Sequence, residues 1–169
     1  SLETLHGKPL VRIVAEQALA SRAKPVVVVT GHQGDRVRAA LSGLDVTFAD
    51  NPHYADGIAS SVKAGIAAVP ADADGAVICL GDMPLVDAGL IDRLIDGLAP
   101  DRGALIVVPA HEGRRGNPVL WSRRFFDELM TLEGDIGARH MIARHTEAVA
   151  EVEAEGQSAF LDIDTPEAL

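Results

Sequence analysis

Acidic side chains follow two of the strands that the sequence predicts. Asp82 comes just after a run of small and apolar residues, 76–80, and precedes Met83 and Pro84. Such a run is typical of a strand buried on both faces. Open α/β sheets bind ligands beyond the carboxyl ends of their strands, so Asp82 is a candidate functional carboxylate. The alternative is that Asp82 only caps the following turn or helix, and the residues alone leave both interpretations open.

A second acidic pair, Asp162 and Asp164, lies in a short predicted strand that Pro166 closes. Alternate residues of a strand share a face, so both carboxylates are expected to project the same way. Asp82 and Asp164 could therefore converge on one Mg²⁺, which proteins commonly bind with one or two carboxylates plus substrate phosphates. Asp164 would also suit the cap of a terminal helix, and the two roles are compatible.

Two further groups of residues are candidates for binding anions. Arg114 and Arg115 lie in a glycine-containing loop after a predicted buried strand, and a guanidinium matches the geometry of phosphate. The alternative is an ordinary solvated basic loop. Ser60 and Ser61 fall in the first turn of a predicted helix, where hydroxyls and free backbone N–H groups can bind an anion or a base. Helix capping would account for one of these serines.

Composition limits the classes of function. The chain has 169 residues, 47% hydrophobic and 24% charged, with a formal net charge of −10, which fits one globular domain over residues 1–169 and argues against general nucleic-acid binding. An acidic protein that binds polyphosphates needs positive charge at the binding site, such as a bound divalent cation. The single cysteine, Cys79, allows no internal disulfide and favours the cytoplasm. No apolar run approaches the ~20 residues of a membrane span, and no signal peptide is visible.

Strand and helix patterns alternate along the chain, which predicts an α/β fold with a mostly parallel sheet covered by helices on both faces. The sheet is expected to become mixed towards one edge. Strands are predicted at 25–30, 45–49, 76–80, 104–109, 118–121, 147–153 and 160–164. Helices are predicted to begin at the Gly7-Lys8-Pro9 turn, to cover 35–42, 58–69, 87–98 and 123–130, and to begin again at 134 and 167.

Several short motifs occur in sequence along the whole chain: Gly7-Lys8-Pro9-Leu10, Val29-Thr30-Gly31, Asn51-Pro52, Gly57-Ile-Ala-Ser-Ser61, Leu80-Gly-Asp-Met-Pro84, Arg115-Gly-Asn-Pro118 and Asp162-Ile-Asp-Thr-Pro-Glu167. In this combination and order the chain resembles the MobA-like NTP transferases, most closely the molybdenum cofactor cytidylyltransferases. The resemblance implies a three-layer, Rossmann-like nucleotidyltransferase fold. It also implies the transfer of a cytidylyl group from CTP to molybdopterin with release of pyrophosphate, and a molybdoenzyme as recipient partner.

The resemblance also implies roles for individual residues. Asp82 would be the principal Mg²⁺ ligand and Asp164 the second, and both would be catalytic. The residues implied to lie near the nucleotide are Thr30, Gly31, Ser60, Ser61 and Gly81. The residues implied to face the molybdopterin substrate are Arg115, Gly116, Asn117 and Pro118. Because the attacking phosphate is already ionised, such an enzyme needs no general base and depends on positioning and charge neutralisation.

The sequence departs from the family pattern in two places. Family members open with a glycine-rich loop that cradles the triphosphate and ends in a lysine, and Ser1 aligns just after that lysine. We therefore expect residues 1–169 to lack the first strand and its loop, to be the C-terminal part of a longer protein, and to be incomplete for catalysis. Asn117 stands where many cytidylyltransferases have histidine. GTP as donor, methylerythritol phosphate as acceptor, and a non-catalytic module that binds nucleotide or cofactor therefore remain alternatives.

Overall fold

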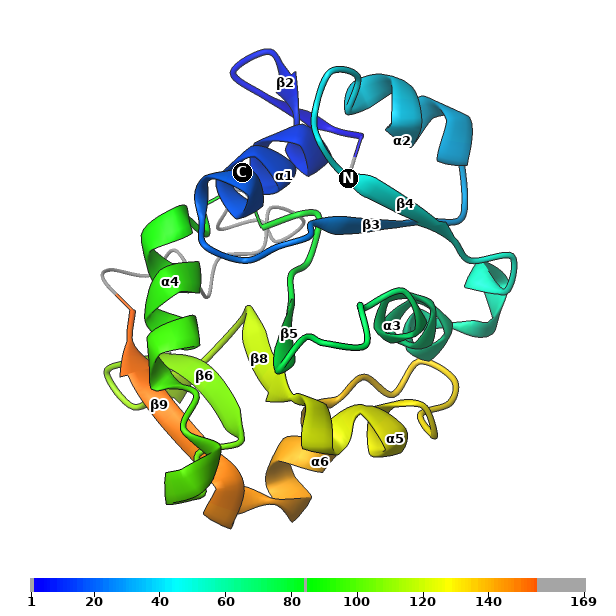
Figure 1. Ribbon diagram of the computed structural model, residues 1–169. Helices are drawn as coiled ribbons and strands as arrows, with labels where there is room; N and C mark the ends of the chain where they lie inside the picture. The colour runs from blue at the N-terminus through cyan, green and yellow to red at the C-terminus, as the bar shows by residue number, and fades with distance from the viewer. Residues whose placement is uncertain (1, 84, 155–169) are drawn as a thin grey trace.

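The computed structural model describes residues 2–83 and 85–154 and confirms the alternation of strands and helices (Figure 1). The strands are β1 Thr4–Leu5, β2 Lys8–Pro9, β3 Val27–Thr30, β4 Thr47–Asp50, β5 Gly75–Ile78, β6 Ile106–His111, β7 Arg114–Arg115, β8 Val119–Ser122 and β9 Val149–Glu153. The helices are α1 Leu10–Ala20, α2 Gly34–Ala40, α3 Ile58–Ala67, α4 Ala88–Gly97, α5 Phe126–Leu129 and α6 Arg139–Arg144. The strand predicted at 160–164 and the helix predicted from 167 lie outside the described residues.

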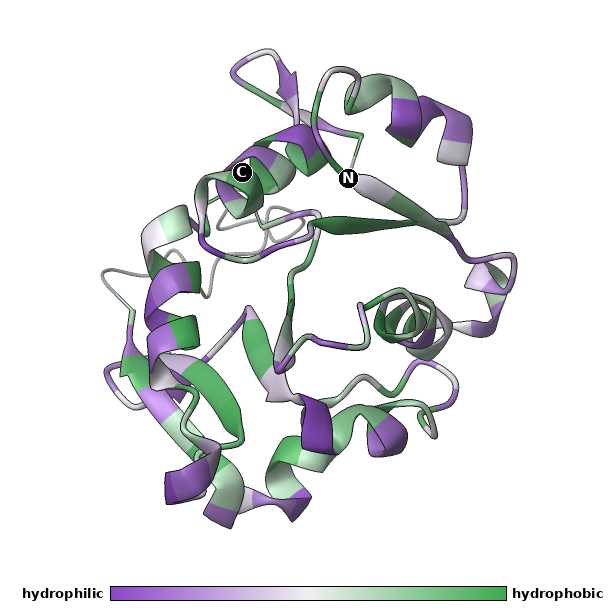
Figure 2. Ribbon diagram, in the orientation of Figure 1, coloured by the Kyte–Doolittle hydropathy of each residue, from purple (hydrophilic) through white to green (hydrophobic). Residues whose placement is uncertain are grey.

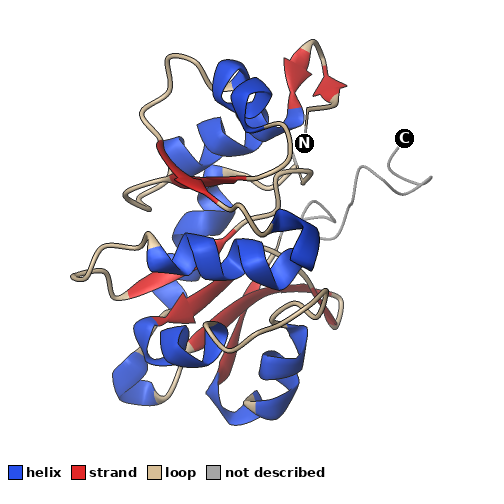
Figure 3. Cartoon of the chain, turned by 90° about the vertical axis from the view of Figure 1, so that its right-hand side faces the viewer, coloured by secondary structure: helices blue, strands red, loops and turns tan. Residues whose placement is uncertain are grey.

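The main strands form two separate sheets. β3 and β4 pair in parallel, while β5, β8, β6 and β7 are antiparallel neighbours in that order and β9 pairs with β6 in parallel. In Figures 1 and 3 the β3–β4 sheet lies above the larger sheet. The mixed sheet and the half-exposed strand near 147–153 are confirmed, but the described strands do not join into one continuous sheet.

Strand alternation divides the core of the larger sheet into two layers. In β6, Ile106 and Val108 belong to the cluster that contains the α3, α5 and α6 side chains, whereas Val107 packs with Leu94 of α4. In β8, Val119 and Trp121 belong to the first cluster, whereas Leu120 packs with Leu94 in the second. Helices therefore cover both faces, with α1 and α4 on one side and α3, α5 and α6 on the other (Figure 1). No helix among the described residues is long and apolar enough to span a membrane.

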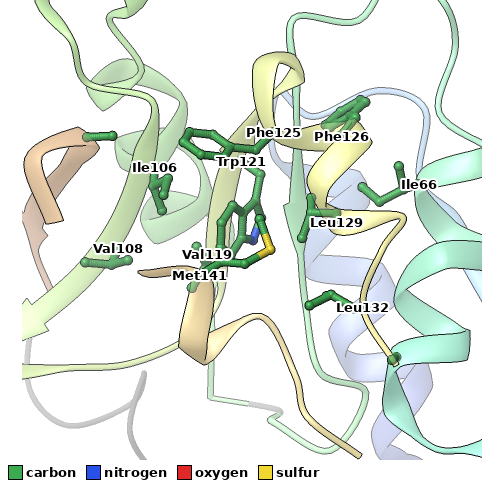
Figure 4. Close-up of a cluster of buried hydrophobic side chains, with 12 residues drawn as sticks. Ile66, Ile106, Val108, Val119, Trp121, Phe125, Phe126, Leu129, Leu132 and Met141 are labelled. Carbon is green, nitrogen blue, oxygen red and sulfur yellow. The ribbon is translucent and has the colours of Figure 1, made fainter. Parts of the chain in front are cut away.

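The indole of Trp121 occupies the centre of the first layer (Figure 4). Its side chain is 1% exposed, and the Phe125 ring meets it edge-on at 6.1 Å between ring centroids. Leu129 and Met141 are buried against it from α5 and α6. The two short helices after β8 are therefore held in place by apolar packing, not by their own length.

The amino end differs from the sequence prediction. Pro9 was expected inside the first turn of a helix, but it ends β2 and directly precedes α1. The cause is a two-residue hairpin turn at His6 and Gly7, whose φ angles are 54° and 82°. Positive φ at both turn residues matches the twist of paired strands, so Thr4–Leu5 pairs with Lys8–Pro9.

β5 is less buried than the sequence predicts. Its four residues are all only partly buried, although the run was expected to be covered on both faces. β5 pairs with β8 on one edge, and within the described ranges no strand pairs with its other edge. That edge borders a cavity of about 1910 Å³ between β5 and β3, and Figure 2 shows apolar residues along both strands. The cavity explains the partial exposure of β5.

Leu94 tests whether α4 packs on the sheet as described. Its side chain is fully buried against Val107 and Leu120, so Leu94→Ala is expected to lower the free energy of unfolding by about 2–5 kcal/mol in urea titrations. Leu85 is 45% exposed, and Leu85→Ala is expected to change it by less than about 0.5 kcal/mol. Equal effects of the two substitutions would contradict this packing.

Candidate active site

The loop that carries Asp82 is anchored to α4. After β5 ends, the backbone N–H of Met83 donates to the carbonyl of Leu80 at 3.3 Å and closes a turn around Asp82. Met83 and Val86 are 5% and 4% exposed and pack against the buried side of α4. The apolar side chains that follow Asp82 therefore hold the loop against α4, and the partly exposed Asp82 lies beyond the end of β5.

The cap of α4 is Asp87, not Asp82. The Asp87 carboxylate accepts a hydrogen bond from the backbone N–H of Leu90 at 2.9 Å, which is the geometry of an N-cap. The N–H of Ala88 donates to the side-chain oxygen of Gln17 on α1 at 3.0 Å. The helix that follows Asp82 therefore has its own capping residues, which favours the functional interpretation of Asp82.

Asn51 links the ends of β3 and β4 to the first turn of α3. It is 3% exposed, and its side-chain amide donates to the hydroxyls of Ser60 and Ser61 at 2.8 and 3.1 Å. Its backbone N–H donates to the carbonyl of Thr30 at 2.6 Å, and its amide oxygen accepts from the N–H of His53. One buried residue, through its side chain and its backbone, therefore links three of the predicted nucleotide-binding residues. Sequence reasoning gave Asn51 no site role, although its position directly after a strand was a signal.

Asp50 lies next to this network and is held charged. The hydroxyl of Thr30 donates to the Asp50 carboxylate at 2.7 Å, and the guanidinium of Arg38 donates at 2.9 Å. The Thr30 hydrogen bond, followed by Arg38, lowers the pKa of Asp50 below its usual value. A hollow of about 470 Å³ borders these residues and Gly31. It offers carboxylate, hydroxyl and backbone groups to a polar ligand.

Two backbone N–H groups in the first turn of α3, where the sequence suggested free donors, are taken by protein carbonyls. The N–H of Ala59 donates to the carbonyl of Gly134 at 3.1 Å, and that of Ser60 donates to Gly57 at 3.1 Å. Gly57 has a φ of 111°, and a Cβ there would lie 2.4 Å from the Gly134 oxygen, so this contact needs glycine. The Ser60 hydroxyl donates to the Gly57 carbonyl at 2.7 Å. The loop around Gly134 therefore takes one of the donors that the sequence suggested for an anion.

The large cavity brings most of the predicted nucleotide-binding residues to one place. Thr30, Gly31, Ser61 and Gly81 all line it, and Asp82 directly follows Gly81. The carboxyl end of β3, the first turn of α3 and the loop after β5 therefore meet at the same cavity. This arrangement places hydroxyl and backbone hydrogen-bonding groups along the cavity, and the Asp82 carboxylate is next in sequence to Gly81.

The loop predicted to face the second substrate lies elsewhere. Residues 115–118 are not among those that line the cavity. The Arg115 guanidinium donates to the carboxylate of Glu151 on β9 at 2.6 Å, and these side chains are 42% and 49% exposed. The N–H of Gly116 donates to the carbonyl of Pro109, and Pro118 is fully buried. Arg115 and Asn117 are the members of this loop whose side chains have polar groups to offer a ligand.

The described residues contain no complete metal site. Asp164 lies outside them, and within residues 2–83 and 85–154 no three His, Cys, Asp or Glu side chains are grouped to hold a metal ion. Asp82 nevertheless offers the hard oxygen ligands that Mg²⁺ and Mn²⁺ prefer, and phosphates commonly complete such a shell. Burial raises the pKa of the Cys79 thiol to about 12, so this residue is neither a thiolate ligand nor a nucleophile at neutral pH.

The model of the MobA-like NTP transferase domain matches residues 1–149 of this chain. The chain belongs to the MobA-like NTP transferase family. Among the relatives of this family, the molybdenum cofactor cytidylyltransferase of Escherichia coli K12 is 30% identical over 143 residues, which is 84% of this chain and 70% of that protein. The family resemblance that the motifs indicated is confirmed.

Other relatives are longer than this chain. The bifunctional protein GlmU of Acidovorax ebreus is 34% identical over 157 residues, and the match covers 87% of this chain but 29% of GlmU. The crystal structure of Mycobacterium tuberculosis Rv0371c complexed with manganese has a TM-score of 0.79 at 27% identity and covers 99% of this chain and 86% of that chain. A nucleotidyl transferase of Methanothermobacter, Mth528, has a TM-score of 0.84 at 22% identity, covering 99% and 80%. The fold is thus the expected Rossmann-like nucleotidyltransferase fold.

Asn51→Ala tests the polar network. The substitution removes the donor shared by the two serines and the acceptor for His53, so we expect the free energy of unfolding to fall by about 1–3 kcal/mol. Amide hydrogen exchange at His53 should become faster than in the parent protein. The matched control Gln33→Ala changes an exposed residue that makes no side-chain cap. A loss as small as that of the control would show that the network does not hold the loop.

Proposed function

We propose that this domain transfers a cytidylyl group from CTP to molybdopterin, giving the cytosine dinucleotide and pyrophosphate, in the cytoplasm and with Mg²⁺. The observation that carries the proposal is the placement of Asp82. It directly follows Gly81, which lines the same cavity as Thr30, Gly31 and Ser61, in a chain 30% identical to a molybdenum cofactor cytidylyltransferase. Nucleotidyltransferases need an oxygen ligand for a divalent cation beside the groups that hold the nucleotide.

In this proposal Asp82 and Asp164 hold the cation, which neutralises charge on the triphosphate. The terminal phosphate oxygen of molybdopterin forms a bond to the α-phosphorus, while the bond from that phosphorus to the bridging oxygen of pyrophosphate breaks. No proton has to be removed from the attacking group, because a phosphate is already ionised at neutral pH. The work of the chain is to align the two phosphates in line and to exclude competing water.

Ser61 is the better donor of the two serines. The Ser60 proton is directed at the Gly57 carbonyl, whereas no acceptor within the described residues takes the Ser61 proton. Because Asn51 donates to the Ser61 oxygen, the hydroxyl proton must point elsewhere, and Ser61 lines the cavity. We assign Ser61 as a donor to the nucleotide, with Thr30, Gly31 and Gly81 beside it.

The acceptor's phosphate is assigned to Arg115, with Gly116, Asn117 and Pro118 shaping its loop. Arg115 is paired with Glu151, so the phosphate has to replace this carboxylate. A phosphate carries more charge and can accept two parallel hydrogen bonds from a guanidinium, which favours the exchange. The position of Asn117 supports a second candidate, a nucleotidyltransferase that takes GTP or another acceptor.

The active protein is proposed to be longer than residues 1–169, with a strand and a glycine-rich loop ahead of residue 1 and a molybdoenzyme that receives the product. The relatives support this proposal, because the match covers 70% of the E. coli cytidylyltransferase. The functional tests below therefore use the full-length protein.

Asp82→Asn tests the proposed reaction. The full-length protein should convert CTP and molybdopterin to the dinucleotide, with CTP preferred over GTP in direct competition. Asp82→Asn removes the charge that holds the cation, so turnover should fall by at least about 100-fold with little change in thermal stability. Asp56→Asn alters a carboxylate of the exposed 54–56 turn and serves as the control. Parent-like turnover by Asp82→Asn would rule out its catalytic role.

Substitutions of Arg115 and Glu151, which should change the KM for molybdopterin in opposite directions, test the acceptor site. Arg115→Ala should raise the KM for molybdopterin about 10-fold or more, because a charged hydrogen bond to phosphate is lost. Glu151→Gln removes the competing carboxylate and should lower that KM by a few fold, in line with a surface ion pair. Neither should change the KM for CTP. Arg36→Ala changes an exposed residue of α2 and is the control. A change in the KM for CTP alone would contradict the assignment.

A further inference from the structure

The carboxyl ends of three strands lie at one edge of the larger sheet. β5 and β6 are both antiparallel to β8 and therefore run in the same direction, and β9 is parallel to β6 and lies beside it (Figure 1). Asp82 follows β5 at this edge, and His111 is the last residue of β6. Because only β8 lies between β5 and β6, the ends of these two strands are about 10 Å apart. His111 therefore belongs to the edge at which α/β sheets bind ligands.

A two-residue turn holds His111 beside the loop assigned to the acceptor. Glu112 and Gly113 have φ angles of 51° and 80°, and positive φ at both turn residues fits a tight hairpin. Across this turn β6 and β7 pair, with His111 opposite Arg114. His111 is thus held next to the strand that carries Arg115.

The His111 ring has one nitrogen committed and one available. Its Nδ1 lies 3.1 Å from a carboxylate oxygen of Glu153 on β9. An ionised carboxylate only accepts hydrogen bonds, so Nδ1 carries a proton in this contact. Nε2 lies 3.7 Å from a carboxylate oxygen of Glu112, which is too long for a hydrogen bond. A proton on Nε2 therefore makes His111 a cation with a donor that has no hydrogen-bond partner within the described residues.

Two carboxylates of β9 compete for the cations at this edge. Glu151 pairs with Arg115 at 2.6 Å, and Glu153 pairs with His111. The two glutamates are two residues apart on one strand, so they share a face and are about 7 Å apart. The other charged groups around His111 are Glu112, Arg114, and Arg93 of α4, whose Nε donates to the Glu153 carbonyl at 3.2 Å. When His111 is protonated, positive charges outnumber negative ones here, although the whole chain carries −10.

The end of β9 connects His111 to the Asp82 loop. Ala154, which follows β9, is 1% exposed and belongs to the same buried cluster as Met83. Its N–H donates at 2.9 Å to the carbonyl of Ala110, the residue before His111. One buried residue therefore contacts both the end of β6 and the loop that carries the carboxylate proposed to hold the cation.

We propose that His111 and Arg115 together bind the terminal phosphate of the acceptor, and that the protonated His111 ring selects a phosphate monoester. This inference rests on the proposed function, which assigns the acceptor's phosphate to Arg115. Nε2–H donates to the phosphate, while Glu153 holds the ring through Nδ1. A phosphate monoester carries a charge of about −1.5 to −2 at neutral pH, and it carries less once it is bridged to a second phosphate. The second cation therefore favours binding of the acceptor over binding of the product.

Sulfate binding to the full-length protein tests this site without turnover. Sulfate resembles phosphate but keeps one charge state across neutral pH, so a change of its Kd with pH comes from the protein. The Kd, measured from the NMR shifts of the amides of residues 114–117, should rise about 5- to 10-fold between about pH 6 and pH 8.5, because imidazole loses its charge in this range. His111→Asn should bind weakly at both pH values. His111→Lys, which stays charged, should bind tightly at both.

The matched control is His140→Asn, which removes an exposed histidine of α6 and should keep the pH dependence of the parent protein. The proposal would be overturned if His111→Asn kept that pH dependence. It would also be overturned if methyl sulfate, a monoanion, bound to the parent protein as tightly as sulfate at low pH. Loss of the proposed reaction is a separate result: a full-length protein without turnover that shows the expected sulfate pattern would refute the reaction but support the anion site at His111.

Discussion

The structure depends on the edge of β5 that faces away from β8. On the paired side, β5, β8 and β6 share a core around Trp121. On the other side, a cavity separates β5 from β3, and α1 and α3 bridge the two sheets. The residues proposed to bind nucleotide lie on both sides of this cavity. The two bridging helices therefore help to set the distance between Thr30 on β3 and Asp82 after β5.

Local sequence signals predicted most elements because the strands are short apolar runs and the helices have apolar stripes. The alternation of Ile106, Val107 and Val108 between two core layers follows from strand geometry alone. The hairpin that ends at Pro9 was missed, because the turn at His6 and Gly7 depends on two positive φ angles. The partial exposure of β5 could not be predicted either, since it depends on which strands are present as neighbours.

For the site, sequence identified residue types but not their partners. Only the structure could assign the cap of α4 to Asp87 and not to Asp82. Asn51 was missed because its importance comes from tertiary contacts between segments that are separate in sequence. Of the N–H groups expected to be free in α3, that of Ala59 donates to Gly134, about 75 residues downstream, and that of Ser60 donates to Gly57. Asp164 lies outside the described residues, so its proposed role as a ligand remains a prediction.

We propose that the β3 end, the first turn of α3 and the Asp82 loop form one nucleotide and cation site. Paramagnetic broadening by Mn²⁺ in the full-length protein with a non-hydrolysable CTP analogue tests this arrangement. We expect strong broadening of the amides of Gly81 and Asp82, with weaker effects at Gly31 and Ser61 and none in α5. Broadening centred on another part of the molecule, with the Asp82 loop unaffected, would show that the cation binds elsewhere.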